Sequence, residues 1–298
     1  MRVFVTGATG FVGQAVVQEL LSAGHTVVGL ARSESKAAEL RAKGVDAIIG
    51  TIEDIEVLKR GASDSEGVVH LAFNHDFTKF AENAKVEYDA IVAIGETLAA
   101  SNRPFVITSG TMMLSKGDLA NEDSQVDFVT FPNPRAGNEG EITKLATQGV
   151  RASAVRLSPS VHGDEDHGFI YMITQIARAK GESAYIGDGQ NKWPAVHRYD
   201  AARLYRLALE KGEPGAKYHG VGEEAITMKE IAETIGQQLG VPTVSKTSEE
   251  AQAHFDGFMA FAVAANNPTS SKKTQERLGW TPTGRGLLAD IKAGVYTQ

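Results

Sequence analysis

The sequence predicts an α/β fold, in which a doubly wound parallel sheet is followed by a smaller, mostly helical C-terminal lobe. Three observations lead to this prediction. Apolar strand segments alternate with amphipathic helical segments as far as Leu157, which is the pattern of a parallel sheet with right-handed crossovers. Regularly spaced glycines follow the first strand segment directly. Beyond Ser158 the alternation gives way to mainly helical patterns.

The first strand, turn, helix and strand are the most informative part. Arg2–Thr6 is a short apolar strand, Gly7–Gly13 is a turn with glycines at i, i+3 and i+6, a helix starts near Phe11, and His25–Leu30 is a second strand. Glycines there permit the tight turn and a close backbone approach to a diphosphate, while the helix directs its free N–H groups at the phosphates. The spacing is a variant of the G-x-G-x-x-G fingerprint of dinucleotide-binding half-domains.

The alternation continues through the next 120 or so residues. Further helices are predicted at Lys36–Lys43, Ile55–Gly61, Tyr88–Ala100 and Glu139–Gln148. Further strands are predicted at Val45–Ile49, Gly67–Ala72, Pro104–Thr108 and Ala152–Leu157. We therefore expect residues 1–157 to form a dinucleotide-binding Rossmann domain.

The remaining residues, 158–298, are expected to form a substrate-binding lobe. Helices are predicted at Phe169–Ala179, Asp200–Glu210 and Met228–Leu239, and 217–221 reads as a strand that can return to the main sheet. Ligands of open α/β sheets bind at the carboxyl ends of the strands. The space between sheet and lobe is therefore the expected active site.

The composition narrows the class of partner. The chain has 298 residues, 42% hydrophobic and 22% charged, and a net charge of −7, which argues against nucleic acid or an anionic membrane as partner. It contains no cysteine, which excludes disulfides and thiol chemistry. A strand that starts at residue 2 and the lack of a long apolar segment lead us to expect a cytoplasmic protein with a small-molecule substrate.

Five segments in order carry a family resemblance: Thr6–Gly13, His70–Ala72, Thr108–Thr111, Arg156–Gly163 and Val196–Asp200. On these residues the chain resembles the short-chain dehydrogenase/reductase superfamily. It is most similar to the extended and atypical branch known as the NAD-dependent epimerase/dehydratase family, whose members bind a nicotinamide dinucleotide and often dimerise. The helices Tyr88–Ala100 and Glu139–Gln148 match the dimer helices of that family.

The resemblance also implies which residues bind the cofactor. In the glycine turn, the diphosphate would be held by Gly7, Thr9, Gly10, Phe11, Val12 and Gly13. Leu71 and Ala72 would lie along a ribose, and Pro159 and Val161 would pass the nicotinamide.

The residues after the second strand favour NADP(H) over NAD(H). An NAD site needs a carboxylate there for the ribose hydroxyls, whereas an NADP site needs a cation for the 2′-phosphate. The strand is followed by Arg32 and Ser33, with no acid before Glu34 and with Lys36 one turn on. The alternative is that Arg32 is a solvated surface charge.

The chain departs from the superfamily at the catalytic acid. Members protonate the reacting oxygen with a Tyr that is assisted by a Lys four residues later, a Ser or Thr, and an Asn. No Tyr occurs between Asp89 and Ile170. Counting back from the strand that ends at Leu157, Arg135 and Glu139 occupy the Tyr and Lys positions, and Asp89 occupies the Asn position.

Several residues remain as candidates for the missing chemistry. The hydroxyls Ser109 and Thr111 survive after the fifth strand, and Thr111 is the preferred donor to a developing alkoxide. His162 and Tyr171 are the other candidate donors. Each has a structural alternative: Thr111 as a strand-end hydroxyl, His162 as a packed imidazole, and Tyr171 as a helix core residue.

Arg135 and Glu139 stand four residues apart at a predicted helix start. They can form a simple i, i+4 ion pair. In the functional alternative, Arg135 donates hydrogen bonds to a substrate oxygen or to the cofactor ribose, and Glu139 holds Arg135 in place. Asp89 would either orient a water molecule or be a solvated helix residue.

Two other segments have compositions that suggest a ligand site. His162–His167 concentrates metal-ligand types, but the spacing fits no familiar metal motif and the glycine and acids indicate a solvated loop, so we expect no metal. The apolar stretch Phe255–Phe261 would line a hydrophobic pocket, or else belong to the lobe core or a dimer surface.

The sequence therefore predicts an NADP(H)-dependent oxidoreductase that transfers hydride between nicotinamide and a carbonyl or alcohol substrate without the usual Tyr–Lys acid. A sugar-nucleotide epimerase or dehydratase is the first alternative. A non-catalytic NADP-sensing protein is the second.

Overall fold

A seven-stranded parallel sheet is the centre of the molecule. The computed structural model describes residues 1–114, 118–126 and 134–297. The strands follow the order β10-β6-β5-β4-β1-β2-β3, and every neighbouring pair is parallel. They are β1 (Arg2–Thr6), β2 (Thr26–Ala31), β3 (Asp46–Ile49), β4 (Gly67–His70), β5 (Pro104–Gly110), β6 (Arg151–Leu157) and β10 (Lys217–Gly220). The predicted doubly wound α/β fold is confirmed.

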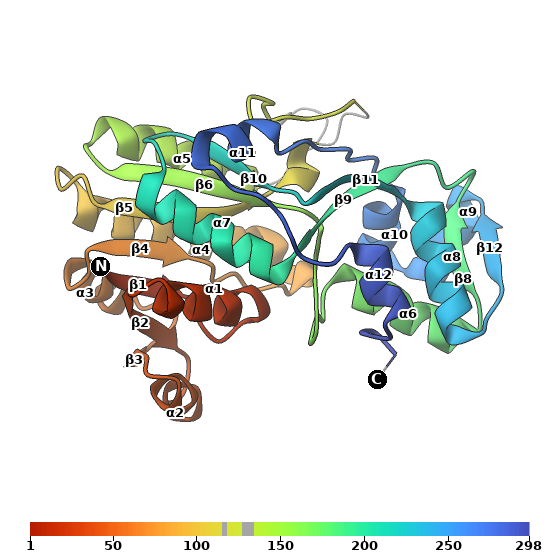
Figure 1. The fold of residues 1–298 in the computed structure, drawn as a ribbon, viewed down its shortest axis with the longest axis horizontal. Helices are drawn as coiled ribbons and strands as arrows, with labels where there is room; N and C mark the ends of the chain where they lie inside the picture. The colour runs from red at the N-terminus through yellow and green to blue at the C-terminus, as the bar shows by residue number, and fades with distance from the viewer. Residues whose placement is uncertain (115–117, 127–133, 298) are drawn as a thin grey trace.

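Helices cover both faces of this sheet (Figure 1). One face packs against α1 (Phe11–Ser22), α2 (Glu34–Ala42) and α7 (Arg198–Lys211), and the opposite face packs against α3 (Ile55–Ser63), α4 (Phe80–Leu98) and α5 (Ala136–Thr147). Alternate strand residues supply the two cores: Val3 and Val5 face α1 and α7, whereas Phe4 faces α3 and α4. Because the seven strands are all parallel, their carboxyl ends lie on one edge of the sheet, next to the lobe.

The chain beyond Leu157 is shared between the sheet and a second body. Helix α7, strand β10 and helix α11 (Lys272–Leu278) pack on the sheet, with Tyr205 and Trp280 in its core. The expected strand at 217–221 is therefore part of the main sheet, as β10, paired with β6. The predicted boundary at 157/158 therefore does not separate the two bodies completely, because some segments after residue 157 pack on the main sheet.

The second body contains two small sheets as well as helices. Its strands are β7 (Ser160–His162), β9 (Lys192–His197) and β11 (Glu223–Thr227) in one sheet, and β8 (Ser183–Ile186) with β12 (Thr243–Lys246) in the other. Its helices are α6 (Phe169–Lys180), α8 (Met228–Leu239), α9 (Ser248–Phe255), α10 (Gly257–Ala264) and α12 (Leu287–Lys292). Trp193, Ile173 and Ile231 are fully or almost fully buried in its core.

Helix α4 is longer than the sequence pattern indicated. It begins at Phe80 rather than at Tyr88, after the short 3₁₀ helix η1 (Phe77–Lys79). The added turns bury Asn83 and Glu87, polar residues that interrupt the apolar pattern and hid this start from the periodicity argument. A second 3₁₀ helix, η2 (Thr111–Leu114), follows β5.

Candidate active site

The glycine turn after β1 has the geometry of an anion cradle. Gly7 has φ +70°, and a Cβ on Gly7 would lie 2.8 Å from the Ala72 nitrogen. A Cβ on Gly13 would lie only 1.9 Å from the Gly7 carbonyl oxygen. The first intrahelical hydrogen bond runs from the Gln14 N–H to the Gly10 carbonyl oxygen, which leaves the N–H groups of residues 11–13 at the open end of α1.

Thr6 fixes the end of β4 beside this turn. Its hydroxyl oxygen accepts hydrogen bonds from the N–H groups of Leu71 at 3.2 Å and Ala72 at 3.3 Å. The same oxygen lies 2.9 Å from Nδ1 of His70. Burial lowers the pKa of His70 to about 4, so this imidazole is neutral near pH 7 and adds no charge to the turn.

At the end of β2, Arg32 is exposed and makes no hydrogen bond or ion pair with the residues that the structure describes. The other nearby charges are paired on α2: Lys36 with Glu39 at 2.8 Å and Arg41 with Glu34 at 2.5 Å. Ser33 caps α2 by accepting from the Lys36 N–H. The cation at this strand end is therefore available to a ligand, while the nearest acid is already paired.

After β6 the chain crosses from the sheet to the lobe. Val161 pairs with Val196 in β7 and β9, and Pro159 lies just before β7. His162 is buried and its Nδ1 lies 2.6 Å from an Asp290 carboxylate oxygen. Burial lowers the pKa of His162, although the Asp290 hydrogen bond opposes that shift. His162 thus has the contacts of a packed imidazole, the structural alternative, rather than those of an open proton donor.

The acidic loop after His162 is not wholly solvated, in contrast to the sequence expectation. Asp166 is buried and accepts a hydrogen bond from the Tyr296 hydroxyl at 2.8 Å. Burial raises the pKa of Asp166 to about 6. Within the described ranges, no group of three or more His, Asp or Glu side chains is placed to hold a metal ion.

Thr111, the preferred donor from sequence, is fully buried. Its hydroxyl donates to Asn267 Oδ1 at 3.0 Å, and Asn267 Nδ2 donates back to the Thr111 carbonyl at 2.9 Å. This reciprocal pair ties the end of β5 to the segment before α11. The Thr111 hydrogen is therefore already donated within the protein, which favours its structural alternative.

Arg135 and Glu139 do not pair with each other as an i, i+4 bridge. Arg135 binds Glu87 on α4, with Nε to Oε2 at 2.8 Å and Nη2 to Oε1 at 2.7 Å. Asn138 donates to the same Glu87 carboxylate at 2.8 Å. The Arg135 guanidinium carbon also lies 4.0 Å from the centroid of the Phe73 ring, so the guanidinium is held in a fixed plane beside the end of β4.

Glu139 turns instead toward the sheet. It accepts from Arg156 Nε at 2.7 Å and Nη2 at 2.5 Å, and from the Ser109 hydroxyl at 2.7 Å. Burial alone would raise the pKa of Glu139, but the hydrogen bonds and charge of Arg156 outweigh burial and lower it. Ser109 and Glu139 are thus held in a buried ionic network under the site, with Arg156 fully enclosed.

Asp89 lies outside this constellation. Its carboxylate pairs with Lys85 at 2.5 Å on the exposed side of α4, so the solvated alternative describes it. Glu87, two residues earlier, is the α4 carboxylate that faces the sheet edge. Tyr171 on α6 is partly exposed and packs edge-on against His167, with ring centroids 5.2 Å apart.

Comparison with known proteins identifies the family. Residues 3–127 match the model of the NAD dependent epimerase/dehydratase family. An uncharacterized protein of Schizosaccharomyces pombe is 51% identical and covers 99% of this chain and 100% of its own length. One of Saccharomyces cerevisiae is 46% identical, with 98% of each chain covered. The chain belongs to the NAD-dependent epimerase/dehydratase family.

More distant relatives and solved structures have named activities. The 2-alkyl-3-oxoalkanoate reductase of Stenotrophomonas maltophilia is 26% identical, covering 83% of this chain and 78% of the reductase. The UDP-glucose 4-epimerase structure of Thermotoga maritima superposes with a TM-score of 0.77 at 21% identity, covering 100% of this chain and 98% of that one. The latter likeness shows the fold alone.

Four residues of the candidate site were not found from sequence: Glu87, Asn138, Asn267 and Arg198. The Arg198 guanidinium lies 5.2 Å from the Phe11 ring centroid and donates to the Asp164 carbonyl oxygen at 2.7 Å. It brings a cation beside the amino end of α1. The signal was available, because Arg198 follows His197 in the segment 196–200 that carries the family resemblance.

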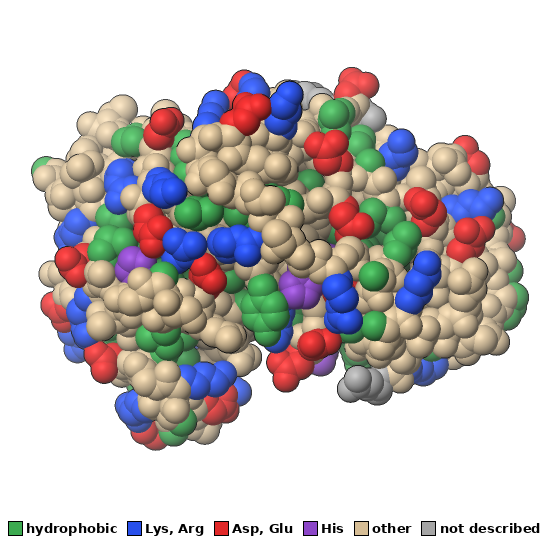
Figure 2. Space-filling view, viewed as in Figure 1, with side chains coloured by type: hydrophobic (Ala, Val, Ile, Leu, Met, Phe, Trp, Pro, Cys, Tyr) green, Lys and Arg blue, Asp and Glu red, His purple; other side chains and the backbone are tan. Residues whose placement is uncertain are grey.

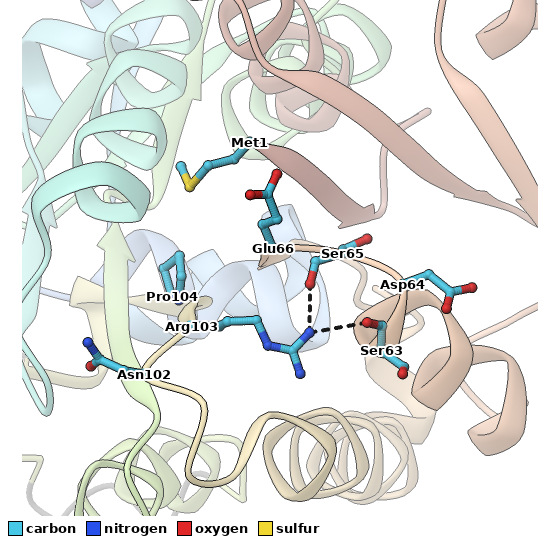
Figure 3. A pocket seen from close by; sticks show the side chains of 8 residues that line it. All are labelled: Met1, Ser63, Asp64, Ser65, Glu66, Asn102, Arg103 and Pro104. Atoms are coloured by element: carbon cyan, nitrogen blue, oxygen red, sulfur yellow. Dashed lines mark hydrogen bonds between the residues drawn. The ribbon is translucent and has the colours of Figure 1, made fainter.

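One surface hollow of this epimerase/dehydratase family member runs along α1 beside Arg198, and another lies away from the glycine turn. A hollow of about 520 Å³ lies at the amino end of the sheet, opposite to the turn, and Figure 3 shows its lining. Arg103 there donates to the carbonyl oxygens of Ser63 and Ser65. These hydrogen bonds stabilise the loop before β4, which is a structural role.

On the face shown in Figure 2, Lys and Arg side chains are interspersed with Asp and Glu. Among the helices that the structure describes, none combines the length and apolarity needed to cross a lipid bilayer.

Proposed function

We propose that this protein is an NADP(H)-dependent oxidoreductase that interconverts a carbonyl compound and its alcohol. The observation that carries the cofactor preference is Arg32, an exposed cation with no partner among the described residues at the end of β2. A 2′-phosphate would form charge-assisted hydrogen bonds with it. The nearest acid along the chain, Glu34, is already paired with Arg41.

The residues of the glycine turn fit the dinucleotide. The Gly7 and Gly13 positions admit no Cβ, because the backbone of the turn already packs against them, and the α1 N–H groups and Arg198 supply positive charge for a diphosphate. When bound, nicotinamide supplies or accepts the hydride. Leu71 and Ala72, held by Thr6, would line the ribose, and Pro159 and Val161 the nicotinamide side.

Arg135 is proposed to stabilise the reacting oxygen in place of the missing Tyr–Lys pair. A guanidinium does not give up its proton at neutral pH, so its part is to donate hydrogen bonds to the developing alkoxide, and water supplies the proton. Glu87 holds Arg135, and Asn138 holds Glu87. Thr111 and His162 are donors of second rank, because both residues are almost completely buried, whereas the Arg135 side chain is 17% exposed.

Reductase chemistry is favoured over the sugar-nucleotide alternative. The curated relatives at 26% identity include a ketoacid reductase by name, and no Tyr is available between residues 89 and 170. Turnover of carbonyl compounds with NADPH would support the oxidoreductase. Intact NADPH binding without any turnover would support the NADP-sensing alternative.

The Arg32→Ala variant tests the cofactor preference. We expect its Kd for NADPH to rise about 10- to 100-fold, the cost of one hydrogen bond to a charged group, while its Kd for NADH stays unchanged. Arg60→Ala, which removes an exposed cation from α3, is the matched control for net charge. An NADPH-to-NADH affinity ratio that Arg32→Ala leaves at the wild-type value would contradict the assignment.

The Arg135→Met variant tests the oxygen-stabilising role. Loss of one preorganised donor lowers kcat about 10²- to 10³-fold, and we expect this with an unchanged Kd for NADPH. Because the change strands the Glu87 carboxylate, Arg135→Met/Glu87→Met should restore stability but not kcat. Lys85→Met, on the exposed side of α4, is the control. Wild-type kcat in Arg135→Met would remove Arg135 from the mechanism.

A further inference from the structure

Aromatic side chains from the sheet edge and from the lobe meet beside Arg135. Phe73 directly follows Ala72 and lies under the Arg135 guanidinium. Phe77 on η1 stacks on Phe258 of α10, with centroids 4.3 Å apart and ring planes 12° from parallel. Aromatic rings of the sheet side and of the lobe therefore contact each other near the carboxyl edge of the sheet, where a substrate would bind.

These rings form a continuous set, which we term the aromatic wall: Phe73, Phe77, Phe80, Phe169 and Phe258. Neighbouring members are 4.3–6.2 Å apart between centroids. Phe169 continues the contact to Trp193 in the lobe core at 5.8 Å. Apart from the closer Phe77–Phe258 pair, these spacings lie in the range of about 4.5–7 Å that favourable stacked or edge-on ring contacts occupy.

The aromatic wall is not buried as a core would be. Phe258 is 37% exposed, and the four other rings are only half-buried. By contrast, Phe4 and Phe105 inside the sheet are fully buried. Several large apolar rings left open beside a fixed charged donor have the composition of a small-molecule site, mostly apolar with a few placed polar groups.

We propose that the substrate is an aryl aldehyde or aryl ketone, whose ring packs on the aromatic wall while its carbonyl oxygen accepts from Arg135. This inference rests on the proposed function. In such compounds the carbonyl group is conjugated with the ring and coplanar with it. A sugar would lose water from its hydroxyls against these rings without gaining partners. Reduction forms a C–H bond with the hydride of NADPH, breaks the C=O π bond, and adds a water proton to the oxygen.

Matched substrate pairs test the substrate class. We expect kcat/KM with NADPH to be about 3- to 10-fold higher for benzaldehyde than for cyclohexanecarbaldehyde, and for acetophenone than for cyclohexyl methyl ketone, the size of one or two aromatic contacts. Phe258→Leu should bring both ratios close to one. Tyr185→Leu, on β8 of the same lobe and outside the aromatic wall, should leave them unchanged.

A binding measurement separates this inference from the proposed function. Benzamide and cyclohexanecarboxamide keep the carbonyl but resist reduction, and their binding to the NADP⁺-loaded protein can be followed by saturation-transfer NMR. Selective benzamide binding that is lost in Phe258→Leu, without turnover of any aldehyde, would retain the aromatic site and reject the reductase. Equal turnover of aryl and cyclohexyl compounds would reject the aromatic site and retain the reductase. Neither selectivity nor turnover would reject both.

Discussion

Replacing Arg156 by Met should lower the free energy of unfolding by about 3–5 kcal/mol, the cost of leaving a buried charge without its partner. Arg156 is fully enclosed and makes a bidentate bond to Glu139. Its Nη1 also donates to the Ser124 carbonyl oxygen at 3.1 Å. Met fills a similar volume but, among the residues that the structure describes, leaves Glu139 with Ser109 and, at 3.6 Å, Lys217. Urea unfolding followed by fluorescence of the two tryptophans measures the change.

The pH dependence of that loss follows from the Glu139 pKa. In the wild type Arg156 lowers the pKa of Glu139 below its usual value of 4.5, so the pair contributes stability above that pH and loses it on acidification. Without Arg156, burial raises the pKa of Glu139 instead. The variant should therefore gain stability as the carboxyl protonates, and its deficit should shrink between pH 7 and pH 5.

Two further variants make the Arg156 prediction specific. Arg156→Met/Glu139→Leu removes both charges and should recover most of the lost stability. Arg41→Met breaks an exposed pair whose arginine side chain is 48% exposed, and should cost less than about 1 kcal/mol. A deficit that persists undiminished at pH 5 and in the double variant would mean that packing, and not the ion pair, accounts for the loss.

The parts of the fold that were predictable from sequence are those governed by local pattern. Strands such as Arg2–Thr6 are apolar on both faces because helices cover both sides of the sheet. The glycine turn is recognisable because its spacing follows from the turn geometry itself. In both cases the determining contacts are close in sequence, so periodicity and glycine positions suffice.

The ion pairs were not predictable in the same way. An i, i+4 bridge between Arg135 and Glu139 is worth only about 0.2–0.5 kcal/mol. Glu87 and Arg156 have side-chain exposures of 1% and 0%, and an unpaired buried charge costs several times more. The buried charges therefore take Arg135 and Glu139 as partners. Which residues are buried depends on how α4, α5 and β6 pack, and sequence spacing does not give this.

Thr111 illustrates the same limit for a neutral side chain. Its partner Asn267 stands 156 positions away in the sequence. The hydroxyl was correctly placed at the carboxyl end of β5, where function is expected. Whether a hydroxyl there is open to substrate depends on which distant segment covers it, and only the folded chain decides that.

Gly13→Ala should weaken NADPH and NADH alike, each by about 100-fold. The added Cβ would stand 1.9 Å from the Gly7 carbonyl oxygen, a backbone atom that cannot move without displacing the turn. Moving the turn misaligns the α1 N–H groups with the diphosphate, and loss of one or two charge-assisted hydrogen bonds costs about 3 kcal/mol. Isothermal titration calorimetry with both coenzymes measures the loss, and circular dichroism verifies that the variant is folded.

A control variant and a comparison with Arg32→Ala show whether the loss of coenzyme affinity arises at the diphosphate. Gly140→Ala on α5 adds a Cβ that meets nothing within 4 Å, and should bind both coenzymes normally. Arg32→Ala weakens only NADPH, because the 2′-phosphate is present on that coenzyme alone, whereas the diphosphate near Gly13 is common to both. A folded Gly13→Ala protein that binds both coenzymes at wild-type affinity would place the diphosphate elsewhere, since no dinucleotide can rest on this turn once its backbone has shifted.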